Sequence, residues 1–581
     1  MLALIFAFSL PAATVFADIN RPPGVDTWCG KAYRATNSSF DPGGWLDKPV
    51  RCSGSDCGSA IRLRAYPRSN VYLENDVMGS FVVDAVSQDP MVDDDWPETE
   101  LEVEIKVTKT GQSHVYDQKI TVGYELGWGK EFSFSLDGLS ASLAPHEVTV
   151  TASTSNGSQV FSTSTQIYKL PARTDGGSVV KLDNLYGGLW IQDKDDWKPF
   201  FPFSYYISWG GWLNVTTDRL NELQAMGYNM VHIVPDCGAE NHAFNFTELT
   251  PFLDRCDEIG MYIQYDMRCT YQNVTMLSYQ LDLLGKHKSL LLWYTSDEPD
   301  GNEEPLNATA IAYKKIKTVD PYHPVSLVLN CYNYYYKEYT SGANIVMTDV
   351  YPISTNTTWS TVYNTPCNTT YGCCGCDDCI GAFEDVSIRL ERYKQYQAWL
   401  DAGPKSFWAT PQAFGNESFW TRYPTGQEVA VMSLLAINHG AKGVVSWIWP
   451  TTDDIANTTS SLAKALTKDN VTELLLGNNP TDAAALYDHR IDAAVWRKDG
   501  PMLVSVVNLE RTTRHDKIEI GLPEVLIDDA TVSIVWGAKG WIIENNHLVK
   551  IGSQPLETSL LLIKMHGQER GDNVSTIHDE V

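Results

Sequence analysis

Hydrophobic and polar positions divide the chain into three regions. Between residues 71 and 175, short runs such as LEVEIKV and HEVTVTA alternate apolar and polar residues, and turn residues separate them. This alternation is typical of strands with one buried face. We therefore predict an all-β sandwich of the immunoglobulin-like type over residues 71–175. Alternation returns near the C-terminus and predicts a smaller β-sandwich over residues 480–566.

The middle region, residues 185–468, alternates short apolar runs with segments of helical period such as TDRLNELQAMG. The apolar runs predict strands at residues 201–208, 229–235, 261–267, 290–296, 324–330, 344–350, 406–412 and 443–449. Eight strand–helix units in this length indicate a (β/α)8 TIM barrel, and a doubly wound open sheet is the alternative. The predicted fold class is multidomain α/β plus all-β, with the TIM barrel flanked by the two β-sandwiches.

The first residues indicate secretion. An apolar run at residues 2–10 precedes small residues and a V-F-A site, which predicts a signal peptide over residues 1–17. Sequons of the form N-x-S/T begin at Asn37, Asn156, Asn214, Asn245, Asn273, Asn307, Asn356, Asn368, Asn416, Asn457, Asn470 and Asn573. We expect a secreted, extracellular protein that carries N-glycans. No later run is apolar for about 18 residues, and the tail at residues 567–581 is polar, so we expect no membrane anchor.

The chain has 12 cysteines, which we expect to form disulfides in an extracellular protein. The segment CNTTYGCCGCDDC, residues 367–379, favours a stapled surface loop over a zinc site. Residues 18–70 form an N-terminal segment with Cys29, Cys52 and Cys57, and we expect it to cover or extend the first sandwich. The spacing leaves the pairing of the cysteines open.

Charge and motifs exclude several classes of function. With 44 Lys+Arg against 72 Asp+Glu the net charge is −28, which argues against a nucleic-acid partner. The sequence has no P-loop, no G-x-G-x-x-G that opens a βα unit, no H-E-x-x-H and no G-x-S-x-G. We therefore expect no metal and no organic cofactor. The 18 Trp, 29 Tyr and 18 Phe favour a carbohydrate partner.

Acidic and aromatic residues end the predicted barrel strands, where barrel enzymes build their sites. The candidates, in chain order, are Tyr205, Asp236, Asp266, Asp297, Glu298, Asp349, Tyr351, Gln412, Trp447 and Trp449. Cleavage of a glycosidic bond requires two carboxyl groups, one protonated to assist the leaving oxygen and one ionised. Trp447 and Trp449 are expected to face the same way because side chains alternate along a strand.

Several stretches resemble the clan A glycoside hydrolases. They are LWIQDKDDWKPFFPFSYY (189–206), WYTSDEPDG (293–301), TDVYP (348–352), PQAF (411–414) and the segment 422–449, in the order that this clan has them. The flanking β-domains are similar to those of enzymes related to glycoside hydrolase family 2. The resemblance implies that Glu298 is the general acid/base. It also implies a glutamate nucleophile at the end of the seventh strand, where this chain has Gln412.

An amide cannot form a glycosyl ester, so the second role passes to another group. Asp349, Glu417 or a nucleophile on the substrate itself, oriented by Asp297 or Asp349, could take it. We favour Asp349, because a strand end aims a side chain more rigidly than a loop does.

The sequence therefore predicts a secreted glycoside hydrolase in which Glu298 protonates the leaving oxygen and Asp349 acts as nucleophile or base. Substrate-binding roles are predicted for Asp297, Asp266, Gln412, Tyr351, Tyr205, Trp447, Trp449 and Asp236. The alternatives are a cell-wall transglycosylase with the same site and a catalytically inactive carbohydrate-binding relative.

Overall fold

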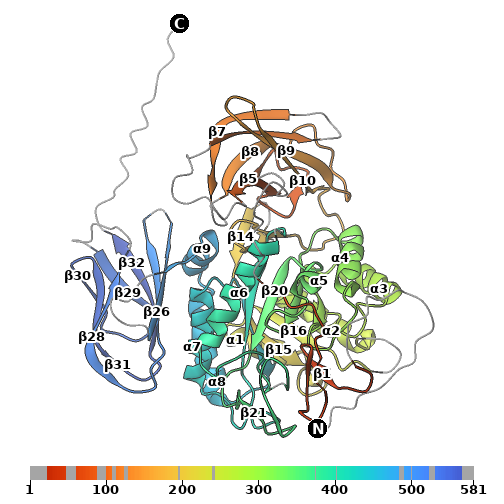
Figure 1. Ribbon diagram of the computed structural model, residues 1–581. Helices are drawn as coiled ribbons and strands as arrows, with labels where there is room; N and C mark the ends of the chain where they lie inside the picture. Colours follow the sequence, from red (N-terminus) through yellow and green to blue (C-terminus); the bar gives the residue numbers. More distant parts are fainter. Residues whose placement is uncertain are drawn as a thin grey trace.

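The computed structural model describes residues 22–565, except residues 39, 48–60, 88–99, 108–112, 124–128, 194–195, 239–242, 373, 401, 483–489, 499 and 523–529. The predicted signal peptide, the polar tail, Cys52, Cys57, Cys373 and the sequon at Asn573 lie outside the described residues. Within them, a barrel occupies the middle of the molecule and β-sheets adjoin it on two sides (Figure 1). No helix in this part of the chain is long and apolar enough to span a membrane.

Eight parallel strands close into a barrel. In barrel order they are β15 (Phe203–Ser208), β16 (Met230–Val234), β17 (Tyr262–Asp266), β18 (Leu290–Asp297), β19 (Val325–Leu329), β20 (Ile345–Val350), β23 (Ser406–Pro411) and β24 (Val444–Trp449). Each overlaps one of the predicted strands, so the TIM barrel is confirmed and the open sheet was wrong. Because every strand runs the same way, all carboxyl ends meet at one rim.

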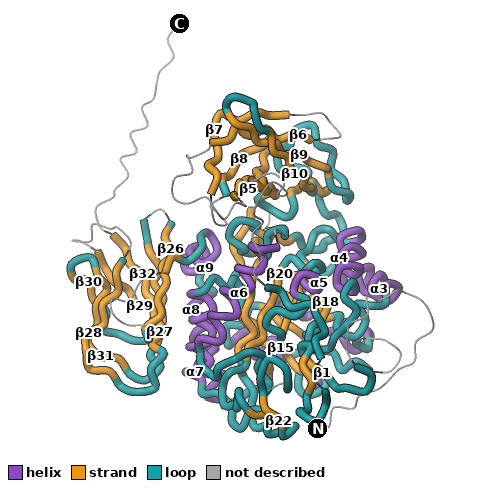
Figure 2. Tube along the Cα trace, viewed as in Figure 1, coloured by secondary structure: helices purple, strands orange, loops and turns teal. Residues whose placement is uncertain are grey.

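Helices follow the strands and surround the barrel (Figure 2). They are α1 (Asp218–Ala225), α2 (Phe246–Ile259), α3 (Val274–Leu284), α4 (Ala308–Val319), α5 (Tyr336–Thr340), α6 (Glu384–Leu400), α7 (Gly426–Asn438), α8 (Asp453–Leu466) and α9 (Asp469–Gly477). Side-chain caps fix several starts: Asn245 accepts from the backbone of Thr247, and Thr425 and Glu428 form a capping box. Helix α7 is buried along its length, because it lies between the barrel and the C-terminal sheets.

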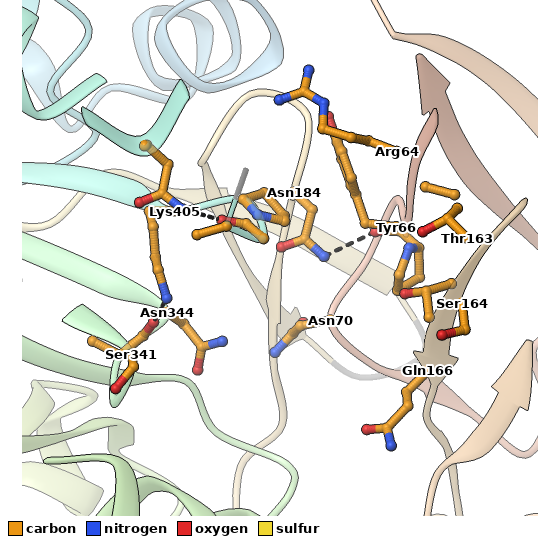
Figure 3. A pocket seen from close by; sticks show the side chains of 18 of the residues that line it. Arg64, Tyr66, Asn70, Thr163, Ser164, Gln166, Asn184, Ser341, Asn344 and Lys405 are labelled. Carbon is orange, nitrogen blue, oxygen red and sulfur yellow. Dashed lines mark hydrogen bonds between the residues drawn. The ribbon is translucent and has the colours of Figure 1, made fainter. Parts of the chain in front are cut away.

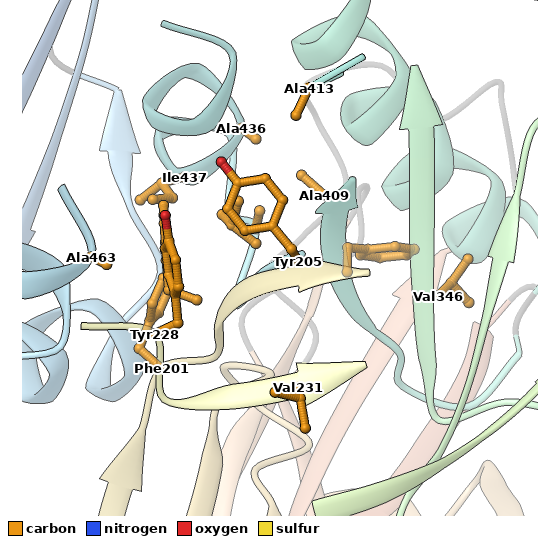
Figure 4. Close-up of a cluster of buried hydrophobic side chains, with 14 of the residues drawn as sticks. Phe201, Tyr205, Tyr228, Val231, Val346, Ala409, Ala413, Ala436, Ile437 and Ala463 are labelled. Carbon is orange, nitrogen blue, oxygen red and sulfur yellow. The ribbon is translucent and has the colours of Figure 1, made fainter. Parts of the chain in front are cut away.

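The layer between the barrel strands and helices α7 and α8 is a hydrophobic core (Figure 4). Tyr205 and Tyr228 both reach the hydroxyl of Thr459, each at 2.9 Å, so their polar ends are satisfied inside this core. The ring of Trp449 lies 5.5 Å from that of Tyr205 and packs edge-on against it. These aromatic residues therefore hold helix α8 against the barrel.

The N-terminal strands form one seven-stranded sheet. They are β3 (Ile61–Pro67), β5 (Met78–Ser87), β6 (Glu100–Val107), β7 (Ser113–Gly123), β8 (Lys130–Ser135), β9 (His146–Thr154) and β10 (Val160–Ile167). Alternate residues of β6, Leu101, Val103 and Ile105, are fully buried in its core, as the alternation predicts. Short strands β4 (Tyr72–Leu73) and β11 (Lys169–Leu170) pair beside it, and β12 (Val180–Leu182), β13 (Leu189–Asp193) and β14 (Asp196–Phe200) lead to the barrel.

The C-terminal strands form two sheets around one core. The first contains β25 (Thr481–Asp482), β26 (Ile491–Arg497), β27 (Met502–Asn508), β32 (Thr558–Met565) and β29 (Ala530–Gly537), and the second β28 (Arg514–Gly521), β31 (His547–Ser553) and β30 (Ile542–Glu544). Val504 of the first sheet and Ile520 and Leu548 of the second share that core. Both flanking regions are thus all-β, and their finer classification as sandwiches stays a prediction.

Disulfides join cysteines of the described residues, as expected: Cys29–Cys331, Cys237–Cys269, Cys367–Cys374 and Cys376–Cys379. Cys256 is a buried free thiol. The first bridge attaches residues 22–47 to the end of β19. These residues include the hairpin of β1 (Thr27–Trp28) and β2 (Lys31–Ala32). The expectation that residues 18–70 cover or extend the first sandwich thus holds for β3 (Ile61–Pro67), which pairs with β5. It is wrong for residues 22–47, because the bridge places them on the barrel.

Candidate active site

A cavity of about 170 Å³ lies at the carboxyl ends of the barrel strands. Its lining residues are Tyr206, Asp297, Glu298, Val328, Asp349, Tyr351, Phe414, Glu417, Trp420 and Trp447. Apart from Val328, each of them is acidic or aromatic. The cavity therefore combines the two kinds of side chain that the sequence placed at this rim.

Glu298, which is half-buried, and Asp349, which is buried, form a carboxyl pair in this cavity. Asn330, just after β19, donates from Nδ2 to Glu298 Oε1 at 3.1 Å and lies 3.4 Å from Asp349 Oδ1. Burial raises the pKa of Glu298, and burial together with the charge of Glu298 raises the pKa of Asp349 well above its ordinary value. The two carboxyls therefore retain one proton between them over a wide pH range.

The backbone around the pair is held from both sides. Glu298 has φ 50°, a left-handed conformation that non-glycine residues rarely adopt and that clusters at functional sites. Asp300 accepts hydrogen bonds from the backbone N–H groups of Asn330 at 3.2 Å and Cys331 at 2.8 Å. Burial raises the pKa of Asp300 to about 7. This clamp fixes the end of β19 next to the loop that carries Glu298.

A second charged network supports Asp297, the last residue of β18 and the neighbour of Glu298. Arg268 donates to Asp297 Oδ2 at 2.6 Å and to the fully buried Asp266 at 2.7 Å, and Tyr294 donates to Asp297 Oδ1 at 2.6 Å. His232 bonds Asp266 at 2.8 Å. Burial acts to raise the pKa of Asp266, but Arg268 and His232 outweigh it and hold that pKa below its ordinary value. Asp297 is thus fixed in position as it faces the cavity.

Aromatic rings form the rest of the cavity. Trp447 lies with its ring centre 5.1 Å from that of Tyr206, and the Arg268 guanidinium lies 5.5 Å from the Trp447 ring. Across the loop after β23, Trp420 donates from Nε1 to the backbone oxygen of Tyr351 at 2.9 Å and packs on Phe414. Flat apolar faces fixed in this way suit the C–H face of a sugar ring.

Four of the predicted substrate-binding residues, Tyr205, Trp449, Asp236 and Asp266, do not line the cavity. Tyr205 and Trp449 face the helices: neighbours in a strand point to opposite sides, so Tyr206 enters the barrel instead of Tyr205. Strand β24 has one extra residue opposite β15, since Tyr205 pairs with Ser446 but Ile207 with Trp449. That bulge turns Trp449 away, so the expectation of one facing for both tryptophans was wrong. Asp236 is exposed and accepts from the backbone of Gly210, and Asp266 supports Arg268.

Gln412 also lies outside the cavity lining. It is fully buried, its Oε1 accepts from the backbone N–H of Ile353 at 2.9 Å, and its Nε2 donates to the oxygens of Ile353 and Phe414. The amide therefore joins the loops after β20 and β23. This geometry explains why an amide stands here, since a carboxylate could not donate to two backbone oxygens.

The predicted set lacked three residues that line the cavity, Tyr206, Phe414 and Trp420, and also Asn330, which donates to the carboxyl pair. Asn330 ends a predicted strand at the catalytic rim, so its position alone could have identified it. Phe414 and Trp420 belong to a loop after the seventh strand. The path of a loop cannot be predicted from the periodicity of hydrophobic residues. The structure does bring together Glu298, Asp297, Asp349, Tyr351 and Trp447 of the predicted set.

A larger cavity of about 610 Å³ lies between the N-terminal sheet and the barrel (Figure 3). Arg64, Tyr66 and Gln166 line one side of it, and Asn344 and Lys405 the other. The described residues around it include no carboxyl group. Of these two cavities, only the smaller one has carboxyl groups among its described lining residues.

No described cluster of side chains fits a metal ion. The one group of suitable size is Cys29, Cys331 and Asp377, but its two cysteines are joined in a disulfide and offer no thiolate. The expectation that the protein needs no metal stays a prediction.

The carboxyl pair should reduce the stability of the folded protein at neutral pH. Because the folded-state pKa of Asp349 lies above its unfolded value of about 3.9, the folded protein binds more protons between the two values, and its free energy of unfolding falls as pH rises through that window. The Asp349→Asn substitution removes this pH-dependent fall in the free energy of unfolding, and the new amide can still donate a hydrogen bond to Glu298. We expect its melting temperature at pH 7 to exceed that of the parent by at least about 2 °C, with the difference shrinking toward pH 4.

Differential scanning fluorimetry across this pH range measures the effect. Asp254→Asn, on the exposed side of α2, is the matched control and should melt like the parent at every pH. A destabilised Asp349→Asn protein at pH 7 would show that the carboxyl is not under strain from burial.

The sequence matches no protein-family model and none of the curated proteins. Solved structures that it resembles include a cyclomaltodextrinase (11% identity, TM-score 0.47, covering 86% of this chain and 99% of that one). Others are a GH30 endoxylanase from Clostridium papyrosolvens C71 (10%, 0.41, 63% and 96%) and a β-D-glucuronidase from Dictyoglomus thermophilum (11%, 0.34, 71% and 69%). These structures are glycoside hydrolases, but at such low identities and TM-scores the function is argued from the geometry of the site.

Proposed function

We propose that the protein cleaves glycosidic bonds, with Glu298 as the proton donor and Asp349 as the carboxylate that attacks the sugar. The observation that carries this proposal is that one amide nitrogen, Asn330 Nδ2, contacts both carboxyls of the pair beside an acidic and aromatic cavity. Such a pair supplies one acid and one negative charge to the same small volume, which is the equipment of a glycosidase. The aromatic rings supply faces for the sugar.

The spacing of the pair favours retention of configuration. Inverting enzymes hold their carboxyls about 6.5–9.5 Å apart to admit a water molecule, and retaining enzymes about 5–5.5 Å apart. Asn330 Nδ2 lies 3.1 Å from Glu298 Oε1 and 3.4 Å from Asp349 Oδ1, and two carboxyls that share one amide nitrogen are nearer the retaining spacing than the inverting one. Asp349 then forms a glycosyl ester while Glu298 protonates the departing oxygen. In the second step Glu298 takes a proton from the water that hydrolyses the ester.

The shared proton has to be on Glu298 when the bond breaks. Burial raises the pKa of both carboxyls, so the pair keeps a proton at a pH at which an ordinary carboxyl is ionised. Both carboxyls contact Asn330 Nδ2, so they are close enough for this proton to reach Glu298 as the sugar enters. We prefer Asp349 to Glu417 as the second carboxylate, because Glu417 is exposed on the loop after β23.

Product release from aryl glycosides and cell-wall oligosaccharides tests the proposal, with the anomer of the first product read by NMR. Turnover with retention is the expected result. Inversion would assign the second carboxyl to a base that activates water. Saturable glycan binding with no turnover of any substrate would favour the catalytically inactive carbohydrate-binding relative.

Activity should follow a bell-shaped dependence on pH. The reactive state has one proton on the pair, so activity falls at low pH when both carboxyls are protonated and at high pH when both are ionised. Because burial raises both pKa values, we expect the optimum to lie above the ordinary carboxyl range of about 4. A profile of kcat/KM measures this, and a rate that stays flat from pH 3 to pH 9 would contradict it.

A transglycosylase with the same site remains a second proposal. A glycosyl ester can be attacked by a sugar hydroxyl instead of water, so retention is compatible with transfer. Transfer products that accumulate at high oligosaccharide concentration, at the expense of hydrolysis, would favour it.

We also propose that the protein is a secreted glycoprotein. Apart from Asn37, which is half-buried, every sequon asparagine in the described residues is exposed, as a glycan requires. The disulfides are consistent with an oxidising compartment. A loss of mass on enzymatic deglycosylation of the expressed protein tests this, and an unchanged mass would contradict it.

A further inference from the structure

Residues 22–47 lie at the carboxyl-end rim of the barrel, where the Cys29–Cys331 disulfide joins two cysteines 302 positions apart in sequence. Ala32 forms a bridge with Tyr371, and Trp45 one with Tyr334 (the N-terminal strand β1 is labelled beside the barrel in Figure 1). Lys31 is buried in an ion pair with Asp377 at 2.6 Å. This segment is therefore firmly attached next to the carboxyl pair.

One side chain of the segment reaches the site itself. Trp28 donates from Nε1 to Asn330 Oδ1 at 2.9 Å. With its oxygen held by the indole, the Asn330 amide presents Nδ2 to Glu298 at 3.1 Å and toward Asp349 at 3.4 Å. The oxygen and nitrogen ends of an amide have nearly the same shape, so a donor on one end is what selects its orientation.

The rest of Asn330 is fixed by other groups. Asp300 accepts its backbone N–H at 3.2 Å, and Arg389 donates to its backbone oxygen. A flip of the side-chain amide would leave these bonds intact, but it would turn Oδ1 toward the ionised oxygens of the pair, which would lose their amide donor. The hydrogen bond from Trp28 therefore opposes the flip of the Asn330 amide, which the backbone contacts of Asn330 permit.

Two features bring Trp28 close enough. The disulfide joins Cys29, its neighbour, to Cys331, the neighbour of Asn330. Gly301 passes directly under the indole: a Cβ atom there would lie 2.4 Å from the ring of Trp28. Only glycine at position 301 permits this approach.

We infer that Trp28 is a positioning residue of the candidate active site, which orients the Asn330 amide so that it donates to the Glu298–Asp349 pair. The inference extends the proposed function, because it assigns part of the site to the N-terminal segment. It requires the carboxyl pair but no particular sugar.

The consequence is a change in the proton affinity of the pair. The other groups that face the pair are Asp297 and Asp300, whose charges raise its pKa values, Arg268, whose charge lowers that of Glu298, and the neutral Tyr351. None of them depends on Trp28 for its charge. Loss of the amide donor removes a bond that favours the ionised form, so the pKa values of the pair rise.

The test compares Trp28→Phe with Trp45→Phe. Trp45 belongs to the same segment, but its Nε1 donates to Asp41 at 3.0 Å, so this control also loses an indole N–H. Infrared spectroscopy of the protonated carboxyl band, identified by its absence in Asp349→Asn, follows the titration without any substrate. We expect Trp28→Phe to shift it upward by about one pH unit and Trp45→Phe to leave it unchanged.

Gly301→Ala tests the same point with Trp28 in place, because the added methyl group displaces the indole. Gly301→Ala should reproduce the upward shift of the carboxyl titration. If Trp28→Phe does not fold, the titration of Gly301→Ala tests the role of Trp28 in its place. On a substrate that the parent cleaves, both variants should lower kcat about tenfold at a pH below the optimum and leave KM unchanged.

A titration of folded Trp28→Phe or Gly301→Ala that coincides with that of the parent would overturn the inference. If the parent cleaves no glycoside, the proposed function fails, and the infrared titration still decides the role of Trp28.

Discussion

Glu298→Gln should lower kcat on a natural glycoside by about 10²–10⁴-fold, because the departing oxygen loses its proton donor. The amide has nearly the shape of the carboxyl and can still accept from Asn330, so the cavity stays intact. A leaving group that needs no proton, such as dinitrophenolate, should restore most of the first step. The initial burst of dinitrophenolate and kcat/KM on the two kinds of substrate, which report the first step, measure the difference.

Asp349→Asn should lose at least as much activity, and with both kinds of substrate, because the amide cannot form the glycosyl ester. Asp254→Asn on the outer side of α2 is the matched control and should retain the parent's rate. If Glu417→Gln abolishes activity and Asp349→Asn does not, the second carboxylate is Glu417. If the recovery with dinitrophenolate occurs in Asp349→Asn instead, the two roles are exchanged.

Arg268→Met should lower the free energy of unfolding by about 3–5 kcal/mol, the cost of an unpaired buried charge. Arg268 is the cation that offsets Asp266, which is fully buried, and it also bonds Asp297. Methionine fills much of the same volume, so the loss reports on charge more than on packing. Denaturant unfolding followed by tryptophan fluorescence measures it.

Arg255→Met is the control for Arg268→Met. It also removes an arginine that pairs with a carboxylate, Glu258, but this pair is on the surface of α2, where such pairs contribute about 0–1 kcal/mol. Equal losses in the two variants would show that the Asp266–Arg268–Asp297 network has no special role. We also expect Arg268→Met to impair catalysis, because Asp297 loses one of its two partners.

The barrel could be predicted from sequence because each strand is a short apolar run with a helix after it. All eight strands of the barrel were predicted at their positions, from β15 at residues 203–208 to β24 at residues 444–449. The rule that barrel sites lie at the carboxyl ends places Glu298 and Asp349 at one rim, and both line the cavity there, while their catalytic roles stay a prediction. The strands could be predicted from the local pattern of hydrophobic residues, and the location of the site from the parallel direction of the strands.

The direction in which each side chain points was less predictable than the position of the strand that carries it. Tyr205 and Tyr206 are adjacent and equally apolar, so periodicity does not say which enters the barrel. Trp449 would face the cavity in a regular strand, but the extra residue in β24 turns it to the helices. A bulge has no signal in the pattern of hydrophobic residues. The role of Gln412 could not be predicted from this pattern either, because its hydrogen-bond partners are backbone atoms of loops.

Contacts between distant segments could not be predicted at all. Trp28 meets Asn330 across more than half the chain, and the only sequence signal is the neighbouring Cys29, which had several possible partners. Pairing of cysteines depends on the folded arrangement and not on spacing. The N-terminal part of the site therefore became visible only with the structure.

The measurement that tests the central claim most directly is to trap the sugar on the protein. Glu298→Gln, incubated with the dinitrophenyl form of a glycoside that the parent cleaves, should accumulate the glycosyl ester because its hydrolysis lacks a general base. Acid quenching, proteolysis and mass spectrometry locate the sugar. We expect it on the peptide that contains Asp349, at Asp349 itself. A sugar attached to Glu417, or turnover with inversion and no attached sugar, would contradict the account.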